Sequence, residues 1–328
     1  MITAYAREPH HIAHLQSVIS CLDPGLFDGW INFPDEASPL TLIASSRDAK
    51  LFRGRSVIYV EHGAGQTYNA DPRGVRIGGY SGSPGLDNVV MFLAPNLTVA
   101  ERWKATYPNT PVSIVGSPYV ANLRDEAAGG PRDCVVLTHH WDCLVCQESM
   151  SAFPYFLPKY RGLIEYLHAL DIEVLGHGHP RAIDALAPEW KKLGLEVVYD
   201  WPEVASRCRL LLCDNSSVQA EAAALDIPLV FLDSPEYRKN THHGGRFWDW
   251  PKGQVSCGPD GLLPAVAEAL RDPFDVRIAR MKMAASAFAT TGESARSLTR
   301  RALRRIVATR SESPSATFHP TGIHPVDG

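Results

Sequence analysis

Short runs of consecutive apolar residues recur along the chain, and most are followed by a polar loop and an amphipathic segment. The runs do not alternate between polar and apolar positions, so strands formed by them should be buried on both faces, as in a parallel sheet covered by helices. Such runs predict strands at Ile2–Ala6, Leu40–Ser46, Ser56–Val60, Val89–Asn96, Val112–Pro118, Cys134–Leu137, Ile172–Arg181, Leu195–Asp200, Leu210–Cys213 and Leu229–Leu232. This repeated alternation of strands and helices predicts an α/β protein.

Periodic apolar positions predict the helices that separate and follow these strands. They cover His10–Leu22, Leu97–Pro108, Phe156–Leu170, Ala182–Leu193, Leu262–Leu270, Val276–Ala289 and Ser294–Arg310. A polar stretch ending in Gly129, Gly130 and Pro131 predicts a linker over 122–131. We therefore expect two doubly wound, Rossmann-like domains at 1–127 and 128–290, a basic amphipathic helix at 291–310 and a disordered tail at 311–328.

The composition indicates where in the cell the protein is expected to be, but says little about which reaction it catalyses. The chain has 328 residues and a formal net charge of -4, which gives no global nucleic-acid signature. No apolar run approaches the roughly 18–20 residues of a membrane span, and no signal peptide opens the sequence, so we expect a cytoplasmic protein. Seven cysteines, an odd number, are expected to be reduced thiols, and no cofactor is expected.

One stretch carries the strongest indication of chemistry. The apolar run Leu210–Cys213 ends in Asp214, Asn215, Ser216 and Ser217, which open a short alanine-rich helix. Ligands of parallel sheets bind where strand ends meet helix N-termini, and unpaired N–H groups there favour a phosphate. The two serines could instead be no more than helix caps. The loop is a candidate diphosphate site.

Histidines follow two other predicted strands. His62 and Gly63 come directly after Ser56–Val60, where glycine lets a ligand approach the backbone and an imidazole could act as a general base. His179 lies near the end of the stretch Ile172–Arg181, where the predicted strand runs into a polar loop. For His62 the alternative is a histidine bonded to a carbonyl in an ordinary turn. For His179 two arrangements are open: either the strand continues and places it on one face with His177, or Gly178 turns the chain and presents it separately.

The order of these motifs resembles that of the CDP-glycerol glycerophosphotransferase family, the teichoic-acid primases and polymerases. The resemblance rests on His62-Gly63, His179-Pro180 and the block that runs from Asp214 through PLVFLDSPEYR, and it covers mainly residues 56–250. It departs from the family at Asn215, where tyrosine is common. The resemblance implies a GT-B fold, in which two doubly wound domains face each other across a cleft and C-terminal helices follow.

The same resemblance implies roles for individual residues. His62 would assist the acceptor hydroxyl and His179 would lie near the donor diphosphate, so both are predicted to be catalytic. The resemblance places Asp214, Ser216 and Ser217 at the donor, with the serines on its phosphates. The other residues predicted to bind the donor are Gly63, His140, Asn215, Glu221, Arg238 and Arg246. The two arginines could add charge-assisted contacts to phosphate, or they could form surface salt bridges instead. No metal is expected in the site.

The expected activity is transfer of a glycerophosphate-type or glycosyl group from a nucleotide-activated donor to an acceptor hydroxyl on a glycan, a lipid-linked glycan or a modified nucleic acid. A nucleotide-sugar glycosyltransferase and a non-hydrolysing nucleotide-sugar epimerase are alternatives on the same fold. A metal-binding module would use His139, His140, Cys143, His177 and His179.

The basic helix leaves a further alternative open. Arg296, Arg300, Arg301, Arg304 and Arg305 lie on one side of the segment that ends at Arg310. Such a helix can dock on an anionic membrane surface or on nucleic acid, or it can pack on its own chain with solvated arginines.

Overall fold

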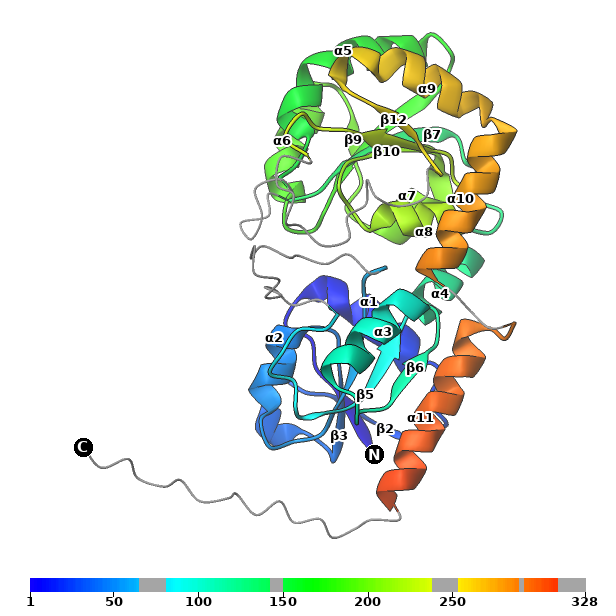
Figure 1. Cartoon of the computed structure of the whole chain (residues 1–328). Coiled ribbons are helices and arrows are strands. Elements are labelled where there is room, and N and C mark those ends of the chain that lie inside the picture. The colour runs from blue at the N-terminus through cyan, green and yellow to red at the C-terminus, as the bar shows by residue number, and fades with distance from the viewer. Residues whose placement is uncertain (65–80, 142–149, 238–252, 289–291, 312–328) are drawn as a thin grey trace, which may run out of the picture.

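A computed structural model describes residues 1–64, 81–141, 150–237, 253–288 and 292–311 (Figure 1). Among these residues the strands form two six-stranded sheets, and every pairing is parallel. The first sheet has the order β2-β1-β3-β4-β5-β6 and the second has the order β12-β11-β10-β7-β8-β9. The prediction of two doubly wound α/β units is confirmed.

The N-terminal sheet is built from strands of three to six residues that are mostly buried. Its strands are β1 Ile2–Ala4, β2 Phe27–Trp30, β3 Leu40–Ile43, β4 Val57–Val60, β5 Val89–Ala94 and β6 Val112–Ile114, and its helices are α1 Pro9–Ile19, α2 Ser46–Ala49, α3 Leu97–Thr106 and α4 Pro118–Ala127. One apolar core lies on each face of the sheet, because successive strand residues point to opposite sides.

The C-terminal sheet repeats this arrangement. Its strands are β7 Cys134–His139, β8 Glu173–Gly178, β9 Glu196–Val197, β10 Cys208–Cys213, β11 Leu229–Leu232 and β12 Val255–Cys257, and its helices are α5 Phe153–His168, α6 Ile183–Lys192, α7 Trp201–Arg207, α8 Val218–Ala224 and α9 Leu262–Arg271. At Gly176, a Cβ atom would lie 2.4 Å from the ring of Trp190, so glycine lets α6 pack directly on β8.

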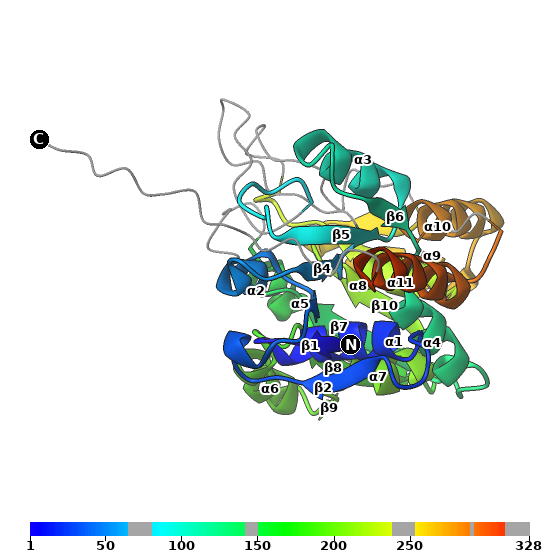
Figure 2. The same cartoon turned by 90° about the horizontal axis from the view of Figure 1, so that it is seen from below.

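Two helices at the end of the described chain lie along one side of both domains (Figures 1 and 2). Helix α10, Phe274–Ala287, packs on α8, and its fully buried Arg280 binds the carboxylates of Asp226 and Asp272. Helix α11, Ala295–Ser311, places Leu298 and Leu303 in the core of the N-terminal domain. The chain therefore returns to the first domain after completing the second.

Several sequence expectations need correction. The predicted linker at 122–131 is helical as far as Ala127, because Ser117 caps α4 and no helix breaker precedes Gly129. The predicted strand Leu195–Asp200 is paired only over Glu196–Val197. Strands β2 and β12 and helix α7 were not predicted, since β2 contains glycine and aspartate and the other two are short.

Four arginines of α11, Arg296, Arg300, Arg301 and Arg304, bind groups of the same chain. The guanidinium of Arg304 donates two hydrogen bonds of 2.7 Å to the carboxylate of Asp23, and Arg300 donates to the carbonyl of Cys21 at 3.2 Å. Arg296 binds Asn122 and Asp125 of α4. Of the two kinds of helix that the sequence allowed, the structure contains the one packed on its own chain. Among the described residues, no helix is long and apolar enough to cross a membrane.

Candidate active site between the domains

Each sheet has a point at which the strand order reverses, and ligands of doubly wound proteins bind beyond the strand ends at such points. In the C-terminal sheet this point lies between β7 and β10. Cys213 pairs with Thr138, and His139 pairs with Gly178, so three adjacent strands end together. The residues that follow them include His140, His179 and Ser216, which the sequence assigned to the donor site.

The reversal in the N-terminal sheet lies between β1 and β3. The chain leaving β1 enters α1, whose first turn carries His10 and His11, while His62 follows β4. The ring centres of His11 and His62 are 4.4 Å apart, and those of His10 and His11 are 4.3 Å apart. His14, one turn further along α1, lies 5.9 Å from His62. The end of this sheet is therefore lined by imidazoles.

The two groups of histidines meet across the domain boundary. The ring centres of His10 and His179 are 5.6 Å apart, and His140 lies 5.0 Å from His179 on the other side. An ion pair of 2.7 Å joins Arg181 to Glu8 close to this contact. The structure thus brings both predicted catalytic histidines, one from each domain, to a single region between the domains.

Hydrogen bonds determine which ring nitrogen of each histidine carries its proton. The Nδ1 atom of His62 lies 2.6 Å from the carbonyl oxygen of Ala44, which can only accept, so Nδ1 is protonated and Nε2 keeps its lone pair. At His179, Nδ1 accepts the backbone N–H of Arg181 at 3.1 Å, so a neutral ring carries its proton on Nε2. His62 can therefore accept a proton, and His179 can donate a hydrogen bond.

The site keeps its histidines neutral. Burial, with a smaller contribution from neighbouring His10, lowers the pKa of His62 to about 4. Burial likewise lowers the pKa of His14 to about 3, and burial followed by the proximity of His140 lowers that of His179 to about 2. All three rings are uncharged near pH 7.

Asp214 has a structural role that the sequence did not indicate. Its carboxylate is fully buried and accepts hydrogen bonds from His139 Nδ1, the His140 N–H, Ser151 Oγ and the Ala152 N–H, at 2.7–3.0 Å. Burial alone would raise the pKa of Asp214, but His139 and these donors hold it below its ordinary value. Asp214 thus ties the end of β10 to the end of β7 and to the start of α5.

The loop after Asp214 differs from the helix cap that the sequence allowed. Ser217 occupies the N-cap position of α8 with helical backbone angles, and its side chain makes no capping hydrogen bond. Gln219 instead donates to the carbonyl of Asp214 at 2.8 Å. Ser216 is buried and Ser217 is half-buried, so of the two the Ser217 hydroxyl is the nearer to solvent.

Two further candidates are enclosed by protein. Asn215 is fully buried, and burial raises the pKa of the enclosed Glu221 to about 7. At Gly63 an added Cβ would meet no atom within 4 Å. Arg238, Arg246 and Cys143 lie outside the described residues.

The remaining ligands of the alternative metal module are not assembled. His139 is hydrogen-bonded to Asp214 and to the hydroxyl of Tyr160 at 2.5 Å, and His177 is bonded to Thr138 Oγ1 at 2.7 Å.

The sequence analysis did not identify His10, His11 and His14 as site residues. Their signal was present, because PHHIAHL follows the first strand in the same way that the other candidates follow theirs.

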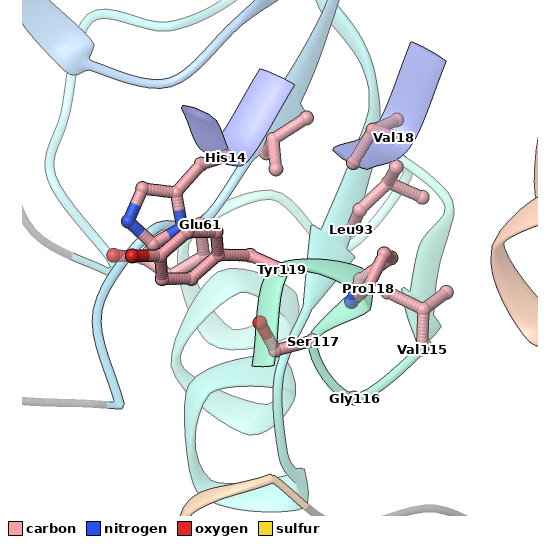
Figure 3. A pocket seen from close by; sticks show the side chains of 10 residues that line it. His14, Val18, Glu61, Leu93, Val115, Gly116, Ser117, Pro118 and Tyr119 are labelled. Atoms are coloured by element: carbon pink, nitrogen blue, oxygen red, sulfur yellow. The ribbon is translucent and has the colours of Figure 1, made fainter. Parts of the chain in front are cut away.

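A small cavity lies beside His14 in the N-terminal domain, lined by residues of α1, β4, β5 and α4 (Figure 3). Its volume of about 10 Å³ is close to that needed by one water molecule, so it cannot hold a nucleotide. Glu61 forms part of its wall and accepts a 3.2 Å hydrogen bond from the indole N–H of Trp103. Burial raises the pKa of Glu61 to about 8, although Trp103 opposes the shift.

No protein-family model matches the chain, and no curated protein matches it. Solved structures are similar in fold. A variant of the wall teichoic acid polymerase TagF with one histidine replaced by asparagine superposes with a TM-score of 0.64 at 13% identity, covering 95% of this chain and 90% of that one. A structure of S. aureus MnaA with UDP gives 0.58 at 12% identity, covering 98% and 99%.

The UDP-GlcNAc 2-epimerase of Methanocaldococcus jannaschii, in complex with UDP-GlcNAc and UDP, gives a TM-score of 0.56 at 14% identity and covers 94% of this chain and 99% of that one. The likeness to these proteins extends over both domains. The chain therefore has the two-domain GT-B-like fold that the resemblance implied.

Replacing Asp214 with alanine is expected to lower the free energy of unfolding by about 3–5 kcal/mol, because it leaves several buried donors without an acceptor. Chemical denaturation measures the change. The control is Asp260→Ala, which removes an exposed carboxylate paired with Lys159 and should have a much smaller effect, because water screens an exposed ion pair. Equal costs for the two variants would contradict the role assigned to Asp214.

Glu61 should make the protein less stable as pH rises. Its pKa is about 8 in the folded chain and 4.5 ordinarily, so between these values the folded state holds the extra proton. The contribution of Glu61 to stability is then lost by up to about 1.4 kcal/mol per pH unit as pH increases. Glu61→Gln should remove this component from denaturation curves measured between pH 5 and 8, whereas exposed Glu101→Gln should retain it. Parallel curves for wild type and Glu61→Gln would refute the assignment.

Proposed function

We propose that this protein is a transferase that moves a glycerophosphate-type or glycosyl group from a nucleotide-diphosphate-linked donor to an acceptor hydroxyl. The observation that carries the proposal is the pairing of two histidines with opposite proton positions across the domain boundary. His62 offers a lone pair on Nε2 and His179 offers an N–H on Nε2, and His10 lies between them. Group transfer needs these two functions at one place.

In the proposed reaction, His62 takes the proton of the acceptor hydroxyl as its oxygen attacks the donor. For a glycerophosphate, a new oxygen–phosphorus bond forms while the bond from that phosphorus to the departing nucleoside monophosphate breaks. For a sugar, the new bond forms at the sugar carbon and a nucleoside diphosphate departs. In either case His179 would donate a hydrogen bond to the phosphate oxygens, on which negative charge develops.

The donor is proposed to lie against the C-terminal domain, with the acceptor against the N-terminal domain. Support comes from the strand-order reversal at β7 and β10, where His140, Ser216 and Ser217 follow adjacent strand ends. Arg181 adds a cation at the rim, with its guanidinium 5.0 Å from the ring centre of Trp141. The fold neighbours with UDP, UDP-GlcNAc or CDPG in their structures support a nucleotide-linked donor.

A nucleotide-sugar epimerase is the second candidate, because epimerases are among the fold neighbours. The two proposed reactions differ in whether they need a separate acceptor molecule. An epimerase converts its substrate without a second molecule, whereas a transferase needs a separate hydroxyl to consume the donor.

Replacing His62 and replacing His179 should have different effects on turnover and on nucleotide binding. His62→Ala is expected to lower kcat by about 10²–10⁴-fold while leaving nucleotide binding unchanged, because only the proton acceptor is lost. His179→Ala should weaken nucleotide binding as well. Donor consumption and calorimetric titration measure the two effects, with His168→Ala, at an exposed histidine of α5, as the control. Full turnover by His62→Ala would disprove its role as base.

A thermal-shift panel of CDP, UDP, GDP and ADP tests the donor, because a ligand that binds the folded state raises the melting temperature. A response to CDP alone favours glycerophosphate transfer, and a response to UDP alone favours the glycosyl or epimerase reaction. The Ser216→Ala/Ser217→Ala double variant should weaken the response, while Ser297→Ala on α11 should not. If none of the four nucleotides shifts the wild-type melting temperature, the nucleotide-donor proposal is wrong.

A further inference from the structure

Three imidazoles of the N-terminal domain converge closely enough to bind one ion. His10 and His11 come from the first turn of α1, and His62 comes from the loop after β4. One ring nitrogen of each lies within 4.8 Å of the others. Within the described part of the chain, this is the one group of three or more His, Cys, Asp or Glu side chains that meets this criterion.

His11 provides a second observation that points to a ligand. Its side chain is 5% exposed, and its Nδ1 has no hydrogen-bond partner among the described residues. Buried polar atoms without partners are rare and costly, so Nδ1 of His11 calls for an explanation. The nearest carboxylate oxygen, on Asp48, is 4.0 Å from Nδ1. That is where an outer carboxylate would orient a metal-binding histidine.

We propose that His10, His11 and His62 form a binding site for a divalent transition-metal ion of the zinc type. Imidazole nitrogens suit Zn²⁺ and Co²⁺, whereas Mg²⁺ and Ca²⁺ prefer the oxygen ligands that this group lacks. In a tetrahedral site, zinc–nitrogen bonds of about 2.0–2.1 Å place the ligand nitrogens roughly 3.4 Å from one another. The ring nitrogens of the three histidines must therefore move closer together by about 1 Å or somewhat more when the ion binds. Three protein ligands leave the fourth position of a tetrahedral site open.

The metal would compete with the reaction proposed above. The nitrogen of His62 that keeps its lone pair is Nε2, and a ring that gives this pair to a metal ion cannot also accept a proton from a hydroxyl. Zinc is therefore expected to inhibit group transfer. This consequence rests on the proposed function, but the binding of the ion does not.

The test uses the full-length chain without a histidine tag, freed of metal by a chelator and titrated with Zn²⁺ in a calorimeter. Titration with Co²⁺, followed by visible absorption, reports the coordination geometry. Wild-type protein should bind one ion per chain. His10→Ala and His11→Ala should each weaken binding at least 10-fold, and His168→Ala should leave it unchanged. His10 is only half-buried, so its variant remains informative if His11→Ala fails to fold.

The outcomes separate the two proposals. Loss of zinc affinity in His10→Ala, together with inhibition of wild-type turnover by Zn²⁺, supports both. Absence of a bound ion, or affinity that His10→Ala and His62→Ala leave unchanged, overturns the metal site while the role of His62 stands. One ion bound through these histidines without inhibition supports the metal site and contradicts His62 as the base.

Discussion

The arrangement of the two sheets is the constraint on which the rest of the molecule depends. Parallel strands all end on the same edge of their sheet, and the strand order reverses between β1 and β3 in one sheet and between β7 and β10 in the other. Because the two edges face each other, residues that follow β1 and β4 approach residues that follow β7 and β8 between the domains. The approach of His10 to His179, and the ion pair of Arg181 with Glu8, are consequences of that geometry.

Much of the fold could be predicted from local pattern. Fully apolar runs such as Leu210–Cys213 are buried on both faces, and a parallel sheet is the arrangement that allows this. The elements that the local pattern did not predict are held in place by packing against residues far away in the sequence. Strand Phe27–Trp30 contains glycine and aspartate and is held by pairing with β1, while α4 runs through a stretch whose polar residues lie on a partly exposed face.

The candidate site could be predicted in position but not in the roles of its members. Strand-end logic located His62, His179 and the loop after Asp214, and the structure brings their strand ends to the domain boundary. The sequence could not show that the carboxylate of Asp214 points into the protein, because this orientation depends on hydrogen-bond donors 62–75 residues away in the sequence. Nor could it show that His11 approaches His62, since their proximity requires β1 and β3 to be neighbours.

The central claim is that one nucleotide-binding site lies between the domains. A crystal structure of the protein with CDP or UDP, whichever raises its melting temperature, tests this most directly. The diphosphate is predicted to lie at the ends of β7, β8 and β10, within hydrogen-bond distance of His179 Nε2. A diphosphate found away from both histidines, for instance in the groove lined by Lys104 and Arg305, would contradict the account.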